Sequence, residues 1–285
     1  MNEQHLPHGS AAEGPYPVAL TPERAGWTYS GLRVLELAPG ASHTLHTAGE
    51  EMLVLPLSGS ASVSCEGSTF DLAGRDSVFT AVSDFAYLPV QATVRIGSER
   101  GGRFALPSAR AGRRLPFRYG PAEKVPVEIR GAGQATRQLN NFCAPDTFDC
   151  DRLVAVEVLT PDGNWSSYPP HRHDECVDGA AVLEEIYYFE VAGADGFGYQ
   201  RVYSSGPERP IDVLAEVRTG DVVLVPHGYH GPSMAAPGHH LYYLNVLAGP
   251  APDRSMAFCD DPAHAWIRSS WADQATDPRV PMTSA

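Results

Sequence analysis

The chain has 285 residues, and 43% of them are hydrophobic, so it can bury a sizeable core and is not a disordered protein. Its formal net charge of −13 argues against nucleic acid or an anionic membrane as a partner. The only lysine, Lys124, lies in a proline-rich connector, so a Schiff-base mechanism is not expected and carbonyl chemistry would fall to a metal ion.

The five cysteines are odd in number and contain no C-x-x-C pair. The first thirty residues are polar and rich in proline and glycine, without the pattern of a secretory signal. We therefore expect reduced thiols in a cytoplasmic protein. Cys176 lies close to a histidine pair and is an alternative soft metal ligand, although a small buried or loop thiol is the commoner role. No apolar run reaches the length of a membrane span.

Residues 1–25 are expected to form a flexible N-terminal arm. After them, short β-rich runs follow one another at intervals of about ten residues, separated by turns such as Pro39-Gly40, and no helical stripe is evident. These runs are residues 27–37, 52–59, 61–65, 77–82 and 92–96. The pattern predicts an all-β sandwich or barrel over residues 26–120.

Residues 100–118 carry six arginines, which form either an anion-binding patch or a solvated connector, and we favour the connector. The link continues through residues 121–152. A second β series then occupies residues 153–271, followed by a tail at residues 272–285, with a short helix expected after Pro262. Two β series joined by one connector suggest an ancient duplication.

The second series contains the densest group of metal-binding residue types. His171 and His173 are two residues apart, so a strand places both imidazoles on one face. Glu185 follows twelve residues after His173, and His230 lies beside a tight turn further on. Three imidazoles and one carboxylate on paired strands predict a site for one divalent ion, with room for a substrate. Zinc, manganese and ferrous iron all tolerate this ligand set.

The first half contains an incomplete version of this pattern. His43 and His46 have the wrong spacing for one strand face, and Glu50 and Glu51 follow them. We therefore expect the first half to be a degenerate copy of the second, without a metal of its own.

The order H-x-H, Glu, G-x5-P-x-G-x-H, with Asn245 beyond, resembles the two motifs of the cupins. It departs from them in two places. Twelve residues separate His173 from Glu185 instead of the usual three or four, and the segment after Gly220 reaches its histidine one residue early. The resemblance implies double-stranded β-helix barrels whose metal sits inside the strands. The ligands that it implies are His171, His173, Glu185 and His230.

Longer strings are more specific. They are residues 163–174 (GNWSSYPPHRHD), 183–188 (LEEIYY), 196–203 (GFGYQRVY), 225–230 (VPHGYH) and 241–249 (LYYLNVLAG). From about residue 25 to 271 the chain resembles the 5-deoxy-glucuronate isomerase family of myo-inositol catabolism, bicupins related to the uronate ketol-isomerases of pectin breakdown. The resemblance implies an aldose–ketose isomerase that converts 5-deoxy-D-glucuronate to 5-dehydro-2-deoxy-D-gluconate, with this small sugar acid as its binding partner.

Within this resemblance Glu185 is preferred to Glu184 as the metal ligand, because it directly precedes Ile-Tyr-Tyr, as in the related ketol-isomerases. The hypothesis for the reaction is a metal-chelated enediol(ate), formed when a base removes the hydrogen from the hydroxyl-bearing carbon. A metal-assisted hydride shift would give the same product. The candidates for the base are His227, Tyr243 and Asp174.

The carboxylate of a uronate needs a fixed cation, and the second half has no lysine. Arg201 alternates with Tyr199 and Tyr203 on one strand face, so it is the expected clamp if that face points inward. The residues expected to bind the substrate are therefore Arg201, Tyr199 and Tyr229. The alternative clamps are Arg172 and Arg254.

Two other classes of function use the same residues. A cupin dioxygenase would employ the same ligands with iron and oxygen, and oxygen uptake would reveal it. A non-catalytic sugar-binding bicupin, as a storage protein or a sensor, would normally bring a secretory signal or a DNA-binding module, and neither is evident. The sequence leaves the oligomeric state open, and a homo-oligomer is compatible with it.

Overall fold

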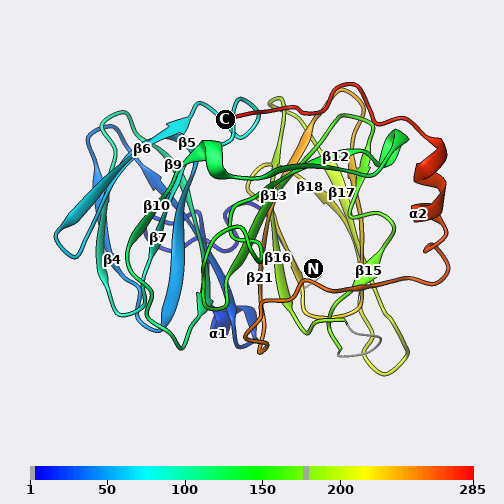
Figure 1. Ribbon diagram of the computed structural model, residues 1–285, viewed down its shortest axis with the longest axis horizontal. Helices are drawn as coiled ribbons and strands as arrows, with labels where there is room; N and C mark the ends of the chain where they lie inside the picture. Colours follow the sequence, from blue (N-terminus) through cyan, green and yellow to red (C-terminus); the bar gives the residue numbers. More distant parts are fainter. Residues whose placement is uncertain (1–3, 176–179) are drawn as a thin grey trace.

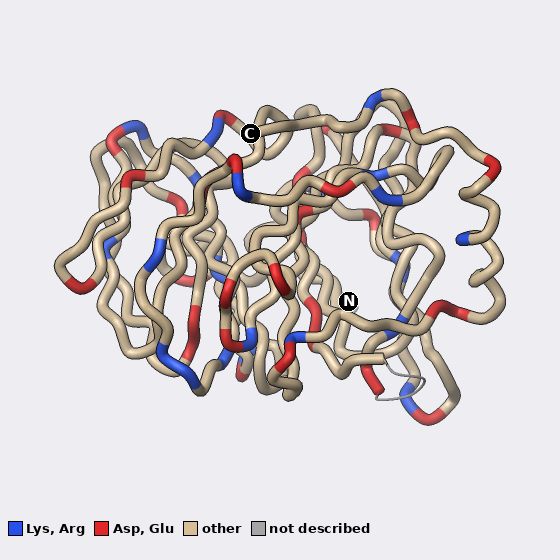
Figure 2. The backbone as a smooth tube through the Cα atoms, viewed as in Figure 1, with Lys and Arg blue, Asp and Glu red and all other residues tan. Residues whose placement is uncertain are grey.

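The computed structural model describes residues 4–175 and 180–285, so Cys176 lies outside the described residues. The described chain is nearly all β-strand and forms two barrel-like halves side by side (Figure 1), which confirms the predicted all-β class. Charged residues are spread over both halves (Figure 2). None of the described helices is long and apolar enough to cross a membrane. The helical segments are α1 (Pro22–Ala25), α2 (Ile267–Ser270) and 3-10 turns at Ala122–Lys124, Gly133–Ala135 and Trp271–Asp273.

The first half is a curled nine-stranded sheet of described residues, built around the long strand β5 (Glu50–Cys65). Four strands pair with β5, namely β6 (Ser68–Arg75), β7 (Phe85–Leu88), β8 (Thr93–Gly97) and β9 (Gly102–Arg110). The others are β2 (Val18–Leu20), β3 (Ser30–Leu37), β4 (Ser42–His46) and β10 (Arg118–Gly120). Alternate side chains point inward, and apolar residues such as Leu35, Val54 and Phe104 fill the interior.

The second half consists of two sheets. One has the strand order β1-β19-β16-β21-β13-β12-β11, and the other has the order β18-β17-β20-β15-β22, with β14 beside β20. An apolar cluster contains inward residues of both, among them Phe189 and Val202, so the sheets pack face to face. The bounds are β1 (His5–Leu6), β11 (Val127–Arg130), β12 (Arg137–Asn141), β13 (Val154–Thr160), β14 (Trp165–Ser166), β15 (His171–Arg172), β16 (Glu184–Val191), β17 (Gly198–Tyr203), β18 (Asp212–Val217), β19 (Val222–Val225), β20 (Tyr229–Ala235), β21 (Leu241–Ala248) and β22 (Cys259–Asp260).

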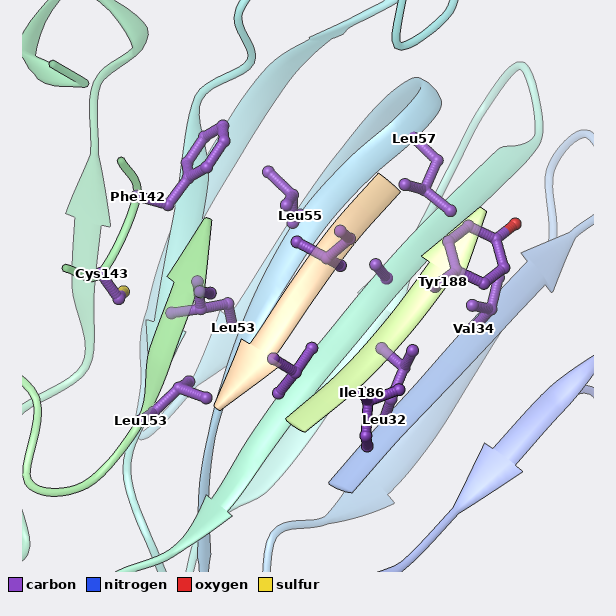
Figure 3. Close-up of a cluster of buried hydrophobic side chains, with 14 of the residues drawn as sticks. Leu32, Val34, Leu53, Leu55, Leu57, Phe142, Cys143, Leu153, Ile186 and Tyr188 are labelled. Atoms are coloured by element: carbon purple, nitrogen blue, oxygen red, sulfur yellow. The ribbon is translucent and has the colours of Figure 1, made fainter. Parts of the chain in front are cut away.

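Strand β16 is buried on both faces. Tyr187 and Phe189 point into the second half, whereas Ile186 and Tyr188 point toward the first half. Figure 3 shows Ile186 and Tyr188 beside the side chains of β3 and β5. The period of two along a strand therefore divides β16 between the interior of its own half and the contact between the halves.

A buried ion pair lies in the contact between the halves. Arg75 comes from the first half and Glu157 from the second, and both side chains are fully buried. Glu157 also accepts hydrogen bonds from the hydroxyl of Tyr242 at 2.8 Å and from the amide of Asn140 at 3.1 Å. Because its neighbours satisfy the carboxylate, the charge is tolerated in a site that excludes water.

Two glutamates join the halves reciprocally. The carboxylate of Glu51, at the start of β5, accepts the N–H groups of residues 151–153 just before β13, at 2.6–2.9 Å, and the hydroxyl of Tyr87 at 2.7 Å. The carboxylate of Glu184, at the start of β16, accepts the N–H groups of residues 28–30 where β3 begins, at 2.7–2.9 Å. Each half thus fixes the chain as it enters the first long strand of the other, which is the relation expected of two copies of one unit.

Segments expected to lie outside the barrels are instead parts of them. β1 pairs with β19, and His5 contacts Asp221 at 3.0 Å, so the N-terminal segment closes one edge of the second half. Strands β11 and β12, from the expected connector, extend the other edge of the same sheet, and β9 takes up much of residues 100–118. Pairing satisfies backbone groups that an open sheet edge would leave exposed. The tail returns to the first half, where the N–H of Val82 donates to the carbonyl of Ser284.

We expect Glu51→Gln to lower the free energy of unfolding by about 2–4 kcal/mol, because the substitution replaces a buried acceptor of four hydrogen bonds with a group that accepts fewer and adds a buried donor. Urea unfolding monitored by circular dichroism would measure the loss as a lower midpoint. The control is Glu66→Gln, which removes only a surface contact with Arg114 and should change stability by less than about 0.5 kcal/mol. Equal midpoints for both variants would contradict the role of Glu51 in joining the halves.

Candidate metal centre and active site

The predicted metal-binding side chains meet at one end of the second half. β15 runs antiparallel to β20 and places His171 directly opposite His230. His173 follows just beyond β15, and one ring nitrogen of each of the three histidines lies within 4.8 Å of the others. Glu185 comes from β16 and brings its Oε2 to 2.9 Å from the Nε2 of His173 and 3.0 Å from the Nε2 of His230.

The donor set fits a divalent cation. The Nε2 of His230 lies close to Glu185 but makes no hydrogen bond to any described residue, an arrangement suited to two ligands of one ion. Burial, followed by the neighbouring imidazoles, lowers the pKa of His171 well below its ordinary value, so this ring is neutral at pH 7. Burial alone would raise the pKa of Glu185, but His230 and His173 hold it far below its usual range. An ionised carboxylate among imidazoles is the environment that a zinc-like ion requires.

A cavity of about 580 Å³ opens beside this group. Its walls come from β11, β12, β13, β16 and β21, and residues of the segment between β21 and β22, including Met256 and Phe258, also line it. His171, His173 and Glu185 form part of its surface. The size suits a small ligand that reaches the histidines with one end.

Two buried tyrosines face this cavity. Tyr187 and Tyr243 place their hydroxyls 3.0 Å and 3.2 Å from the Oγ of Ser167, which links them. Burial raises the pKa of both tyrosines, so both hydroxyls keep their protons at neutral pH. Ser167 has φ of 47°, an uncommon left-handed conformation, and a Cβ on Gly231 would lie 1.8 Å from the Ser167 carbonyl. A glycine at 231 is therefore what lets this loop approach β20.

The model of the KduI/IolB family matches residues 5–267, which is most of the chain. The chain belongs to the KduI/IolB family. This confirms the family resemblance inferred from the strings around the histidines.

Relatives in the KduI/IolB family extend over nearly the whole chain. A 5-deoxy-glucuronate isomerase of Geobacillus kaustophilus is 39% identical over 273 residues, 95% of this chain and 97% of that protein. A 5-deoxy-glucuronate isomerase of Bacillus subtilis is 37% identical over 251 residues, 87% of this chain and 91% of that protein.

Solved structures confirm the bicupin fold. An IolB-like protein from Salmonella typhimurium superposes with a TM-score of 0.86 at 36% identity, covering 93% of this chain and 99% of that one. A variant of Bacillus subtilis oxalate decarboxylase superposes with a TM-score of 0.61 at 14% identity, covering 91% and 80%, and this likeness concerns the fold alone.

Some predicted substrate residues of this KduI/IolB chain lie outside the cavity. On β17 the buried positions are Gly198, Gln200 and Val202, so Tyr199 and Arg201 face outward. Arg201 pairs with Asp212 on β18 and donates to the carbonyls of Val202 and Val213. The predicted alternation along β17 is present, but the face with Arg201 is the outer one. Another residue must therefore bind the carboxylate of a substrate in the cavity. Tyr229 also lies outside, with its ring 5.8 Å from the guanidinium of Arg172.

Two of the three candidate bases also lie outside the cavity. Asp174 accepts the N–H of Gly228 at 3.0 Å and pairs with Arg209 at 2.6 Å, so its carboxylate braces the loop before β20. Burial, and then the charge of Arg209, lowers the pKa of His227, which does not line the cavity either. Tyr243 is the candidate that does line it. The alternative ligand Glu184 points to the first half, as described above.

Sequence reasoning missed several cavity residues. Tyr187 is not among the predicted site residues, although it lies two positions from Glu185 and so shares its strand face. That spacing was a usable signal. Ser167 and Arg137 carried no comparable signal, because a loop and a strand of the expected connector bring them to the cavity.

We predict that His171→Ala or His173→Ala will lose the bound divalent metal, because each removes one of the three imidazoles. The fold should persist, since the apolar clusters do not depend on these side chains. Metal content by mass spectrometry and circular dichroism would measure both. The control is the double variant His43→Ala, His46→Ala in the first half, which should keep one ion per chain. Full metal content in His171→Ala and His173→Ala, or loss in the control, would contradict this site.

Proposed function

We propose that the protein isomerises 5-deoxy-D-glucuronate to 5-dehydro-2-deoxy-D-gluconate. The observation that carries the proposal is near full-length similarity to 5-deoxy-glucuronate isomerases, at up to 39% identity across 97% of a relative. The site agrees with it, since three imidazoles and one carboxylate meet beside a cavity of sugar-acid size, and two protonated tyrosines line that cavity. Cys65, Cys143 and Cys150 are buried, and the cytoplasmic location expected from the cysteine pattern of the sequence is part of this proposal.

We propose His171, His173, Glu185 and His230 as the residues that hold one divalent ion. When bound, such an ion polarises the aldehyde and neighbouring hydroxyl oxygens of the substrate and acidifies the hydrogen between them. The imidazoles enter as neutral ligands, and Glu185 supplies a single negative charge. The site then keeps a net positive charge next to the cavity.

The tyrosines supply protons at the substrate oxygens. In the aldose-to-ketose direction, the aldehyde oxygen becomes a hydroxyl and the neighbouring hydroxyl becomes a carbonyl. The hydrogen on the hydroxyl-bearing carbon moves to the former aldehyde carbon. Tyr243 and Tyr187 present protonated hydroxyls joined through Ser167, so Tyr243 can give a proton to the aldehyde oxygen while the proton that leaves the neighbouring hydroxyl returns to the tyrosines through the same chain. We assign Tyr243 the role of donor to the substrate, with Ser167 and Tyr187 as its relay.

The activity is tested by following 5-deoxy-D-glucuronate with NMR in the presence of the purified protein. We expect the aldehyde and hydrate signals to give way to the signals of a hydroxymethyl ketone. A chelator should stop the reaction, and a divalent metal should restore it. An oxygen electrode run in parallel should record no uptake. Uptake coupled to substrate loss would point to a dioxygenase, and binding without turnover would point to a sugar-binding protein.

Tyr243→Phe should lower kcat about 100-fold with little change in KM, because the variant keeps the ring and loses the proton donor. Metal content should stay at the wild-type level. Tyr199→Phe is the matched control, since this tyrosine lies on the outer face of β17 and its loss should leave turnover unchanged. A Tyr243→Phe enzyme with wild-type kcat would remove this hydroxyl from the reaction.

A further inference from the structure

One cation in the cavity lacks a counter-charge. Arg137, at the start of β12, lines the cavity and is only 5% exposed. Its Nη1 donates to the carbonyls of Ala135 at 3.0 Å and Tyr168 at 3.4 Å. Within residues 4–175 and 180–285, no carboxylate lies at ion-pair distance from it, and no hydrogen bond engages its Nε or Nη2. The guanidinium thus has unused donors beside the cavity.

The two other arginines that line the cavity are already neutralised. Arg130 makes two hydrogen bonds to Glu128, at 2.7 Å and 2.9 Å. Arg268 is bound in the same two-pronged way by Asp260. An anion that enters the cavity therefore finds its strongest uncompensated charge at Arg137.

Buried arginines elsewhere in the fold have their donors satisfied. Arg75 is fully buried against Glu157. Arg254 donates to three backbone carbonyls from both of its terminal nitrogens. Arg137 has neither a carboxylate partner nor carbonyls at both terminal nitrogens. Burial lowers its pKa to about 10, as expected for a buried cation without a nearby negative charge. The ring of Trp271, 5.5 Å away, offers the charge some support.

The backbone places this cation near the metal centre. Arg137 binds the carbonyl of Tyr168, and the next carbonyl, that of Pro169, lies 3.3 Å from the Nδ1 of His171. Tyr243, on the cavity wall, is close enough to Arg137 for the guanidinium charge to oppose the rise that burial causes in the tyrosine's pKa. The two carbonyls belong to the adjacent residues Tyr168 and Pro169, so Arg137 and His171 are held near each other. A single small molecule can therefore reach both.

We propose that Arg137 binds the carboxylate of the sugar acid while the reacting end lies at the histidines. The proposal rests on the proposed function and adds the orientation of the substrate in the cavity. It replaces Arg201 as the clamp. Binding of the acid would supply the missing counter-charge through the free Nε and Nη2 donors, which match the two oxygens of a carboxylate.

The experiment compares two substrates in Arg137→Lys, Arg137→Met and the outer-face control Arg201→Met. One is 5-deoxy-D-glucuronate, and the other is neutral 5-deoxy-D-glucose, which carries a hydroxymethyl group in place of the carboxylate. We expect kcat/KM for the acid to fall roughly 10- to 100-fold in Arg137→Met and less in Arg137→Lys, which keeps the charge without the fork. The neutral sugar should change less than threefold, and Arg201→Met should match wild type with both.

Stability and metal content separate binding from a structural role. Removing an uncompensated buried charge should leave the thermal midpoint of Arg137→Met at or above the wild-type value. Its metal content should be unchanged. Equal losses for acid and neutral sugar, or a lower midpoint together with lost metal, would overturn the proposal.

Calorimetry with gluconate and sorbitol keeps this test independent of turnover. If the wild type fails to isomerise 5-deoxy-D-glucuronate, the proposed function fails. Arg137 as a carboxylate site is then still supported when gluconate binds the wild type more tightly than sorbitol and loses that advantage in Arg137→Met. It is overturned when the two ligands bind wild type and variant alike.

Discussion

The architecture depends on strands that are buried on both faces. On β16 and β21, one set of side chains builds the cavity of the second half, and the alternate set packs against the first half. A shift of such a strand by one residue would turn every side chain to the other face. Polar side chains would then enter the apolar contact between the halves, and apolar side chains would enter the cavity. The packing between the halves therefore fixes the register of the strands that carry the proposed metal ligands.

The two halves share a fold and differ in what fills it. Apolar side chains such as Leu35 and Phe104 fill the interior of the first half. In the second half, polar side chains occupy the corresponding inward positions near one end, and a cavity remains. One half is thus a packed support and the other contains the cavity, and the buried pair of Arg75 and Glu157 joins them.

The sequence predicted the features that depend on local periodicity. The two-residue spacing of His171 and His173 placed both rings on one side. The choice of Glu185 over Glu184 came instead from the resemblance to the ketol-isomerases, in which the ligand directly precedes Ile-Tyr-Tyr. Periodicity does not say which face of a strand is inward when both carry polar groups, and for that reason Arg201 was misplaced. Arg137 could not be found from the sequence, because its significance lies in lacking a partner. That is known only once every neighbouring carboxylate has been located.

Adjacent residues at the start of β16 serve two different purposes. Glu184 accepts hydrogen bonds from the backbone of the first half, and Glu185 reaches the proposed metal-binding histidines on the opposite side of the same strand. A movement of the first half would therefore displace the backbone that carries Glu185. The half with a filled interior thus helps to set the position of the carboxylate of Glu185, which we propose as a metal ligand. If the halves separated, Glu184 would lose its partners in the first half, and the neighbouring carboxylate of Glu185 would lose a constraint on its position.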